Sequence, residues 1–362
     1  MTDMMNAFVL MGHGDFDMLA WHESWPVPVP SGDEVLIKVG ACGLNNTDIN
    51  TRTAWYSKSV SENTTGGAFD DADDEDATWG GAAITFPRIQ GADVVGEVVG
   101  LGAEADQSLL GKRVMIDTWL RDWSDPDNRD KCGYYGSECD GGFAQYTKIS
   151  QKYVHPVSSS LSDAELATFA TSYITAENML ERAQVTKGDS VLITGASGGV
   201  GSALIQLAKR RGAITIGLSS PSKAESLYDI GADHVIDRNT SALKDDIEAA
   251  TGKRTVSVLA DVVGGDNWHH WLDCIERGGR LTCAGAIAGP MVTFDLRTFY
   301  LRDLTFTGAT IVPVGLFARL VSYIEAGELK PLLAAQYPLR DLHDAQRAFI
   351  AKSHIGNIVV TP

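Results

Sequence analysis

The chain has 362 residues, more than one typical domain holds, and 44% of them are hydrophobic, which is enough to build sizeable cores. With 47 acidic against 30 basic residues, the formal net charge of −17 disfavours nucleic acid and anionic membranes as partners. The sequence has no apolar run of about 18 residues and no basic start followed by an apolar core, so we expect neither a membrane span nor a signal peptide.

The N-terminal region alternates apolar and polar side chains in the manner of β-strands, at 7–10, 18–21 and 34–39. The proline-rich segment 25–33 lies between the last two and cannot be helical. The sequence therefore predicts a β-rich domain at the start of the chain.

A series of motifs follows this opening. They are GACGLNNTD (40–48), INTRTAWY (49–56), PRIQGADVVGEVVGLG (87–102), GKRV (111–114) and GGFAQY (141–146). In this order they resemble the medium-chain dehydrogenase/reductase superfamily, most closely its zinc-free quinone oxidoreductase and enoyl reductase branch. The resemblance implies an α/β protein with a GroES-like catalytic domain over 1–155 and 317–362. It also implies a Rossmann domain with a doubly wound parallel sheet over 156–316.

The resemblance also indicates what the chain lacks. Zinc alcohol dehydrogenases of the superfamily carry a Cys, a Gly-His-Glu and a second Cys, and these ligand positions fall at Asn45, Ala92 and approximately Thr171. None of these side chains offers the thiolate, imidazole or carboxylate that zinc prefers. Of the family's structural zinc lobe only Cys132 and Cys139 remain, so we expect no metal. Few, scattered cysteines are typical of reduced thiols in a cytoplasm.

Residues 57–86 form an insertion with an acidic core at 70–76. This core lacks the Gly and the final Glu at EF-hand spacing, which disfavours calcium. A solvated loop is the plain interpretation. Because Trp55, Tyr56 and Trp79 flank it, we hypothesise that it forms part of a lid or of the substrate pocket.

The resemblance places Asn45 and Tyr56 at the catalytic cleft. We expect the Asn45 amide to donate to the cofactor or the substrate, and Tyr56 to donate to an enone oxygen or to supply the proton that completes reduction. A turn-stabilising Asn45 and a packed aromatic Tyr56 are the structural alternatives. Asp48 and Arg52 are expected to hold the loop through local pairing.

Helical periodicity returns at 161–180. The resemblance places Thr175 of this segment near the nicotinamide, whereas a hydroxyl bonded to its own helix backbone is the alternative. Glu177 has no counterpart role. A buried carboxylate without a partner is costly, so Glu177 should matter if it faces the cleft.

The segment 191–209 carries the most informative local pattern. An apolar run reaches a glycine-rich turn at 195–201, after which apolar residues return at helical spacing. This predicts a strand, a tight turn and a helix whose free N–H groups face a dinucleotide pyrophosphate. Apolar runs at 215–218, 256–263 and 280–284 complete an alternation of strands and helices that is typical of a parallel sheet. The expected contacts in the turn are Ala196, Ser197, Gly198, Gly199 and Val200.

The end of the second strand decides the nicotinamide cofactor, because an Asp or Glu there binds the ribose 2′-hydroxyl and repels a 2′-phosphate. The chain offers Ser219, Ser220 and Lys223 at this place, and no carboxylate. Arg238 falls where NADPH-dependent relatives place a Tyr. Charge-assisted bonds from Lys223 and Arg238 favour NADPH, and the alternative is a capped helix start with two solvated cations.

Further cofactor contacts come from the resemblance alone. It assigns them to strand ends near Val263, Gly285 and Ala286, and to Asn357, which stands where a Lys is common. It also implies a homodimer.

We expect NADPH-dependent hydride transfer to a quinone or an α,β-unsaturated carbonyl, because without zinc the developing charge must spread onto a remote, hydrogen-bonded carbonyl. One alternative is an alcohol or aldehyde dehydrogenase that uses Asp93, Glu177 or a distorted metal site. Another is a non-catalytic NADPH-binding protein. The acceptor stays open between a quinone, an enone and an enoyl-CoA.

Overall fold

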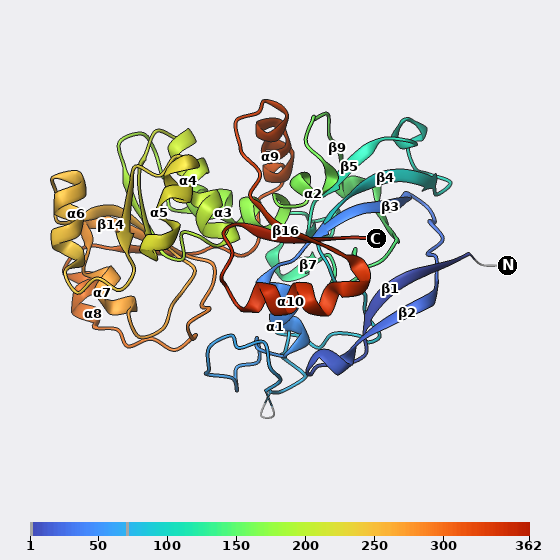
Figure 1. The fold of residues 1–362 in the computed structure, drawn as a ribbon, viewed down its shortest axis with the longest axis horizontal. Helices are drawn as coiled ribbons and strands as arrows, with labels where there is room; N and C mark the ends of the chain where they lie inside the picture. The colour runs from blue at the N-terminus through green and yellow to red at the C-terminus, as the bar shows by residue number, and fades with distance from the viewer. Residues whose placement is uncertain (1–2, 70–71) are drawn as a thin grey trace.

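The structure, a computed structural model, describes residues 3–69 and 72–362, so Asp70 and Asp71 of the acidic insertion lie outside the described residues. Two sheets with their helices lie at opposite ends of the elongated molecule, and β16, an edge strand of one sheet, and α10 lie near the middle of the view (Figure 1). None of the helices in the described ranges is long and apolar enough to cross a membrane.

One sheet has six parallel strands in the order β12-β11-β10-β13-β14-β15. The strands are β10 (Ser190–Ile193), β11 (Ile214–Ser219), β12 (His234–Asp237), β13 (Val256–Asp261), β14 (Ile275–Cys283) and β15 (Thr305–Gly308). The helices of this part are α3 (Ala170–Arg182), α4 (Gly199–Arg210), α5 (Ala224–Asp229), α6 (Leu243–Thr251), α7 (Trp268–Leu272), α8 (Leu296–Tyr300) and α9 (Leu316–Glu325). This strand order confirms the predicted doubly wound Rossmann sheet.

The other sheet has the order β16-β17-β3-β4-β5-β9, and β8 also pairs with β3. Its strands are β3 (Glu34–Gly43), β4 (Asp93–Leu101), β5 (Arg113–Ile116), β8 (Tyr146–Ser150), β9 (Val154–Pro156), β16 (Leu333–Pro338) and β17 (Asn357–Thr361). Smaller pairs and helices complete this GroES-like part: β1 (Met4–Leu10) with β2 (Leu19–Pro26), β6 (Trp119–Leu120) with β7 (Gly133–Tyr134), α1 (Asn46–Arg52), α2 (Asp163–Leu166) and α10 (Leu342–Ile350). Strands from both chain ends share this sheet, while the domain limits at 155 and 317 stay predictions.

Short 3-10 turns connect these elements. They are η1 (Phe16–Met18), η2 (Gln107–Leu109), η3 (Arg129–Lys131), η4 (Gln151–Tyr153), η5 (Pro221–Lys223) and η6 (Leu339–Asp341). The last of them leads directly into α10 and the final strand of the GroES-like sheet.

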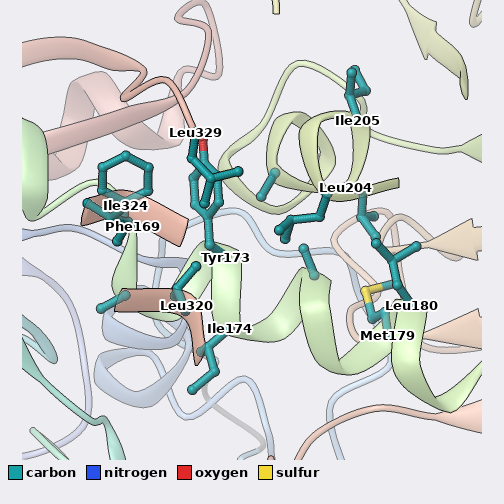
Figure 2. Close-up of a cluster of buried hydrophobic side chains, with 14 of the residues drawn as sticks. Phe169, Tyr173, Ile174, Met179, Leu180, Leu204, Ile205, Leu320, Ile324 and Leu329 are labelled. Atoms are coloured by element: carbon teal, nitrogen blue, oxygen red, sulfur yellow. The ribbon is translucent and has the colours of Figure 1, made fainter. Parts of the chain in front are cut away.

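Helix α3 packs against elements of both parts of the molecule. Its side chains Tyr173 and Ile174 pack against Leu320 and Ile324 of α9, and further along it faces Leu204 of α4 (Figure 2). Burying a large apolar side chain stabilises a fold by roughly 1.5–3 kcal/mol, so this cluster fixes α3 firmly. The helix thereby holds its first turn at the boundary between the two sheets.

Arg52 anchors the insertion. Its guanidinium is fully buried and donates to Gly14 O at 2.8 Å, to Gly66 O at 3.0 Å and to Gln346 Oε1 at 3.2 Å. Burial lowers the pKa of Arg52 to about 10, and the charges of Asp15 and Asp17 oppose this shift. The expected pairing of Arg52 with Asp48 is therefore wrong: three segments distant in sequence hold this side chain.

Candidate active site

The glycine-rich turn forms the predicted strand, turn and helix. Gly195 has φ +58°, a left-handed conformation that glycine adopts without strain, and Gly198 precedes the first residue of α4. A Cβ on Gly201 would collide with the backbone of Gly195 and Ala196. Helix and strand thus approach closely, and the free N–H groups of α4 face the carboxyl edge of the sheet, the usual position of a dinucleotide pyrophosphate.

The C-terminal segment closes over this turn. Gly356 N donates to Ser197 O at 3.1 Å, and Asn357 Nδ2 donates to Ser172 Oγ at 2.9 Å. Asn357 is buried, and its Oδ1 has no hydrogen-bond partner in the described chain. The Asn357 side chain thus fastens β17 to α3 beside Gly199, and only its oxygen stays free to meet a cofactor.

Basic groups gather at the end of β11, opposite Asp237 at the end of β12. Lys223 Nζ donates to Lys352 O at 3.0 Å and to His354 O at 2.7 Å, and no ion pair joins Lys223 or Arg238 to an acid of the described residues. Burial lowers the pKa of Lys223, and the charge of Arg238 lowers it further. Ser219 Oγ is buried there without a partner among the residues described. These donors fit a ribose and a phosphate.

The remaining predicted contacts fall in three places. Val263, Gly285 and Ala286 follow β13 and β14, at the edge where the glycine turn follows β10. Ser220 Oγ lies 3.2 Å from Ser222 Oγ, and Ala196 and Val200 flank the turn itself. In doubly wound sheets ligands bind at this carboxyl edge, so the fold brings these residues to one side.

A buried polar cluster lies at the start of α1. Asp48 Oδ2 accepts the Asn45 N–H at 2.7 Å, closing the first turn of the helix, and Gln90 Nε2 donates to Asp48 O at 3.0 Å. Burial raises the pKa of Asp48 to about 8, with the charge of Asp93 adding to the shift. Asn45 Nδ2 is buried and has no partner within hydrogen-bond geometry in the described ranges. The Asn45 amide is thus available to a ligand.

Asp93, the first residue of β4, continues this cluster. Its Oδ1 accepts from Thr171 N at 3.0 Å and from Thr171 Oγ1, which in turn lies 2.6 Å from Tyr134 Oη. Burial raises the pKa of Asp93 to about 6, while hydrogen bonds from Thr171 and the nearby Asn45 amide dipole oppose the rise. Asp93 Oδ2 is buried without a partner among the residues that the structure describes.

The resemblance drawn from the sequence puts the catalytic zinc ligand positions at Asn45, Ala92 and Thr171, in or next to this cluster. Asn45 supplies an amide, Thr171 a hydroxyl, and the Ala92 side chain no donor atom. No group of three or more His, Cys, Asp or Glu side chains in the described ranges is arranged to hold a metal ion. The residues therefore do not fit zinc, which takes thiolate, imidazole and carboxylate ligands.

Tyr56 and Thr175 lie close to the cluster. Burial raises the pKa of Tyr56, while hydrogen bonds with the side chains of Thr47 and Asn50 oppose the rise and the charge of Asp48 adds to it. Thr175 stands one helical turn after Thr171 on α3, and residues four apart share a helix face.

Glu177 takes no part in this site. Its carboxylate is 4% exposed and lies 2.8 Å from Arg211 Nη2, at the far end of α4 from the glycine turn. The alternative in which Glu177 serves a dehydrogenase is therefore wrong, because a buried ion pair holds the carboxylate.

The insertion contacts both the Rossmann part and the GroES-like part of the chain. Thr64 N donates to Ile287 O at 3.3 Å, beyond β14 of the Rossmann sheet. Trp79 stands edge-on to Trp119, with ring centroids 4.9 Å apart, and lies 6.4 Å from the ring of Tyr134. These contacts place the insertion along the polar cluster and support its hypothesised role as a cover.

Sequence reasoning missed Tyr134 and gave Asp93 only as an alternative. Asp93 follows Ala92 in the motif at 87–102, and its place next to an expected zinc ligand position could have identified it. Tyr134 had none, because 37 residues separate it from Thr171.

Two family models match the chain. They are the alcohol dehydrogenase GroES-like domain over residues 31–159 and the zinc-binding dehydrogenase over residues 199–325. Quinone oxidoreductase of Homo sapiens is 25% identical over 360 residues, covering 96% of this chain and 94% of that protein. Acryloyl-coenzyme A reductase of Sulfurisphaera tokodaii is 25% identical over 351 residues, covering 94% of this chain and 96% of that protein. The solved structure of a putative alcohol dehydrogenase from Sinorhizobium meliloti is 42% identical, with a TM-score of 0.90, and the match covers 100% of this chain and 98% of that one.

Proposed function

The chain belongs to the medium-chain dehydrogenase/reductase superfamily, whose members are oxidoreductases with a dinucleotide-binding domain, and from this premise we propose that it reduces a quinone or an α,β-unsaturated carbonyl with NADPH and without a catalytic metal. The observation that carries the proposal is the amide, hydroxyl and carboxyl cluster of Asn45, Thr171 and Asp93. Within this cluster Thr171 donates to Asp93, and the Asn45 amide keeps a donor for a developing oxyanion. None of these groups replaces a Lewis acid.

The proposed roles follow from the contacts of each side chain. NADPH supplies hydride when bound. The buried, unpartnered Asn45 Nδ2 donates to the cofactor or the substrate, and Tyr56 donates to the acceptor oxygen. Thr175 faces the nicotinamide, and Asn357 Oδ1 accepts from the cofactor beside the glycine turn.

The first test is NADPH oxidation by protein of known metal content. We expect turnover with 1,4-benzoquinone, 9,10-phenanthrenequinone, an alkenal or an enoyl-CoA, by protein that holds no zinc and keeps its rate in a chelator. Zinc at one per chain, with alcohol oxidation that a chelator abolishes, would identify an alcohol dehydrogenase instead. Tight NADPH binding without turnover on any acceptor would identify a binding protein.

The choice of NADPH rests on Lys223 and Arg238, because neither forms an ion pair with an acid among the described residues, although Asp237 lies opposite Ser219. Replacing Arg238 by alanine is expected to raise the KM for NADPH about tenfold, since an exposed charge-assisted bond to a 2′-phosphate contributes roughly 1.5 kcal/mol. The KM for NADH, which has no such phosphate, stays constant.

The matched control is Lys253→Ala, which removes another exposed cation of the same part of the chain. An equal change for NADPH and NADH in Arg238→Ala, or an equal change in the control, would assign Arg238 no part in selecting the cofactor.

An alcohol dehydrogenase is the second candidate. It is favoured by the 42% identity to a protein described as a putative alcohol dehydrogenase, and the chelator experiment separates the two activities.

We also propose a homodimer formed along β15, the last strand of its sheet. Large apolar side chains are exposed near this edge: Met291, Leu296, Tyr300, Leu301 and Val314. Several exposed large apolar side chains near an open sheet edge are typical of an interaction surface.

A further inference from the structure

Asp93, Thr171 and Tyr134 form an unbroken line of hydrogen bonds from a buried carboxyl to a phenol. Asp93 Oδ1 accepts from Thr171 Oγ1, which lies 2.6 Å from Tyr134 Oη. Asp93 and Tyr134 are both buried, and Thr171 between them is half-buried. Asp93 Oδ2 has no partner in the described part of the chain and has room for a proton. Such an arrangement holds a proton and passes it along.

The end of this line formed by Thr171 and Tyr134 lies beside the dinucleotide turn. Ser172, the neighbour of Thr171 on α3, packs so closely that a Cβ on Gly199 would collide with its hydroxyl. Tyr134 therefore carries its hydroxyl to the point where α3 meets the first turn of α4.

Aromatic rings exclude water from the other sides of Tyr134. The Trp119 ring lies 5.4 Å from it at an interplanar angle of 68°, and Trp79 packs edge-on against Trp119. Glu138 Oε2 accepts from Tyr134 N at 2.6 Å and from Trp79 Nε1 at 3.3 Å. This carboxylate fixes Tyr134 and the tryptophan of the insertion together, which keeps the phenol in one orientation.

We propose that Tyr134 is a catalytic residue that protonates the acceptor oxygen, and that Thr171 and Asp93 are positioning residues that return a proton to it. The inference rests on the proposed reductase function. Tyr56 has no equivalent line, since its hydroxyl meets the side chains of Thr47 and Asn50.

The proton and electron balance is complete for an enone. Its β-carbon gains a hydride with two electrons from NADPH, which becomes NADP⁺, and the π electrons move to the oxygen to give an enolate. The Tyr134 O–H bond breaks as its proton passes to the enolate oxygen. The O-protonated product is an enol, which tautomerises to the saturated ketone. Thr171 then returns a proton to Tyr134 and Asp93 returns one to Thr171, and solvent replaces the proton of the fully buried Asp93 through Thr171, the half-buried member of the line. One enone, one NADPH and one proton give one saturated ketone and one NADP⁺.

Burial favours the protonated form of Asp93 and raises the pKa of this carboxyl to about 6, within reach of neutral pH. The other titratable groups of the cluster are Asp48, Cys42, Tyr56 and Tyr134. Burial raises the pKa of each of the four. The line therefore lies among groups whose protonated forms burial favours, and among the described residues no cation forms an ion pair with Asp93.

The experiment measures carbonyl polarisation separately from turnover. The probe is 2-cyclohexen-1-one with carbon-13 in its carbonyl group, bound with NADP⁺ so that reduction does not occur, and the readout is the isotope-edited infrared C=O stretch. We expect a shift to lower frequency on binding to the wild-type protein and loss of most of this shift in Tyr134→Phe, in which Asn45 and Tyr56 remain as weaker donors.

In turnover with NADPH, Tyr134→Phe and Thr171→Val are expected to lower kcat about 100-fold or more, with the KM for NADPH unchanged within about twofold. Thr171→Ser keeps the hydroxyl and is expected to restore turnover. The matched control is Tyr135→Phe, because the Tyr135 hydroxyl also bonds a threonine, Thr147, but not Thr171. This control keeps both the C=O shift and the rate.

Each possible result supports or overturns the proposed relay. An unchanged C=O shift in Tyr134→Phe overturns the relay even if the wild-type enzyme is active, and so do equal losses in Tyr134→Phe and Tyr135→Phe. If the wild-type protein reduces no acceptor, the proposed function fails. The C=O band then still decides: a shift in wild type that Tyr134→Phe mostly removes supports the relay, and no shift in wild type overturns it.

Discussion

Replacing Arg211 by methionine is expected to lower the free energy of unfolding by about 3–5 kcal/mol, because it leaves a buried carboxylate without its cation. Arg211 Nη2 lies 2.8 Å from Glu177 Oε1, and the two side chains are 19% and 4% exposed. Methionine keeps much of the aliphatic volume, so the loss comes from the unpaired charge. Urea unfolding at neutral pH measures the change.

Two further variants separate charge from packing. The double variant Arg211→Met, Glu177→Gln removes both charges and is expected to recover most of the lost stability. Arg254→Met breaks exposed pairs with Asp245 and Glu248 and is expected to change stability by less than about 1 kcal/mol. A single variant as stable as wild type, or a double variant no better than the single one, would contradict this role of the pair.

The Rossmann part of the fold was predictable because its signals are local. A glycine turn at 195–201 followed by helical spacing encodes strand, turn and helix within about twenty residues. The observed β10 and α4 confirm it. The residues of the turn meet the cofactor through their backbone, so their spacing alone indicated the binding edge.

Long-range contacts account for what the sequence did not reveal. The pairing of Arg52 with Asp48 was a local expectation, yet the partners of Arg52 include Gln346, which is 294 residues away. Periodicity and spacing carry no information on such contacts. Glu177 shows the same effect, since its partner Arg211 belongs to the next helix.

The candidate site was predictable in part for the same reason. Asn45 belongs to a motif and lies in the cluster at the start of α1, as its position in the motif indicated. Tyr134 comes from a two-residue strand that no periodicity marks, and only the tertiary fold brings it to Thr171. Where a family's metal ligands are replaced, the substitutes must be found in space.

Replacing Asp48 by asparagine is expected to flatten the pH dependence of stability and to stabilise the protein at alkaline pH. Asp48 is 4% exposed, and burial raises its pKa from the ordinary 3.8 to about 8. Between these values the folded protein holds a proton that the unfolded chain has released. The free energy of unfolding of the wild-type protein therefore falls as pH rises through this window, by up to about 1.4 kcal/mol for each pH unit.

Asparagine removes the ionisation and keeps an oxygen that accepts the Asn45 N–H, so the first turn of α1 stays closed. Asp93 remains and retains its own fall in stability up to about pH 6. Urea unfolding from about pH 4 to about pH 9 is therefore expected to give curves that diverge most above pH 6, with the variant the more stable by several kcal/mol. Asp273→Asn, at an exposed position, is the control and keeps the wild-type slope. Parallel curves for Asp48→Asn and wild type would mean that Asp48 ionises in the folded protein as it does in the unfolded chain.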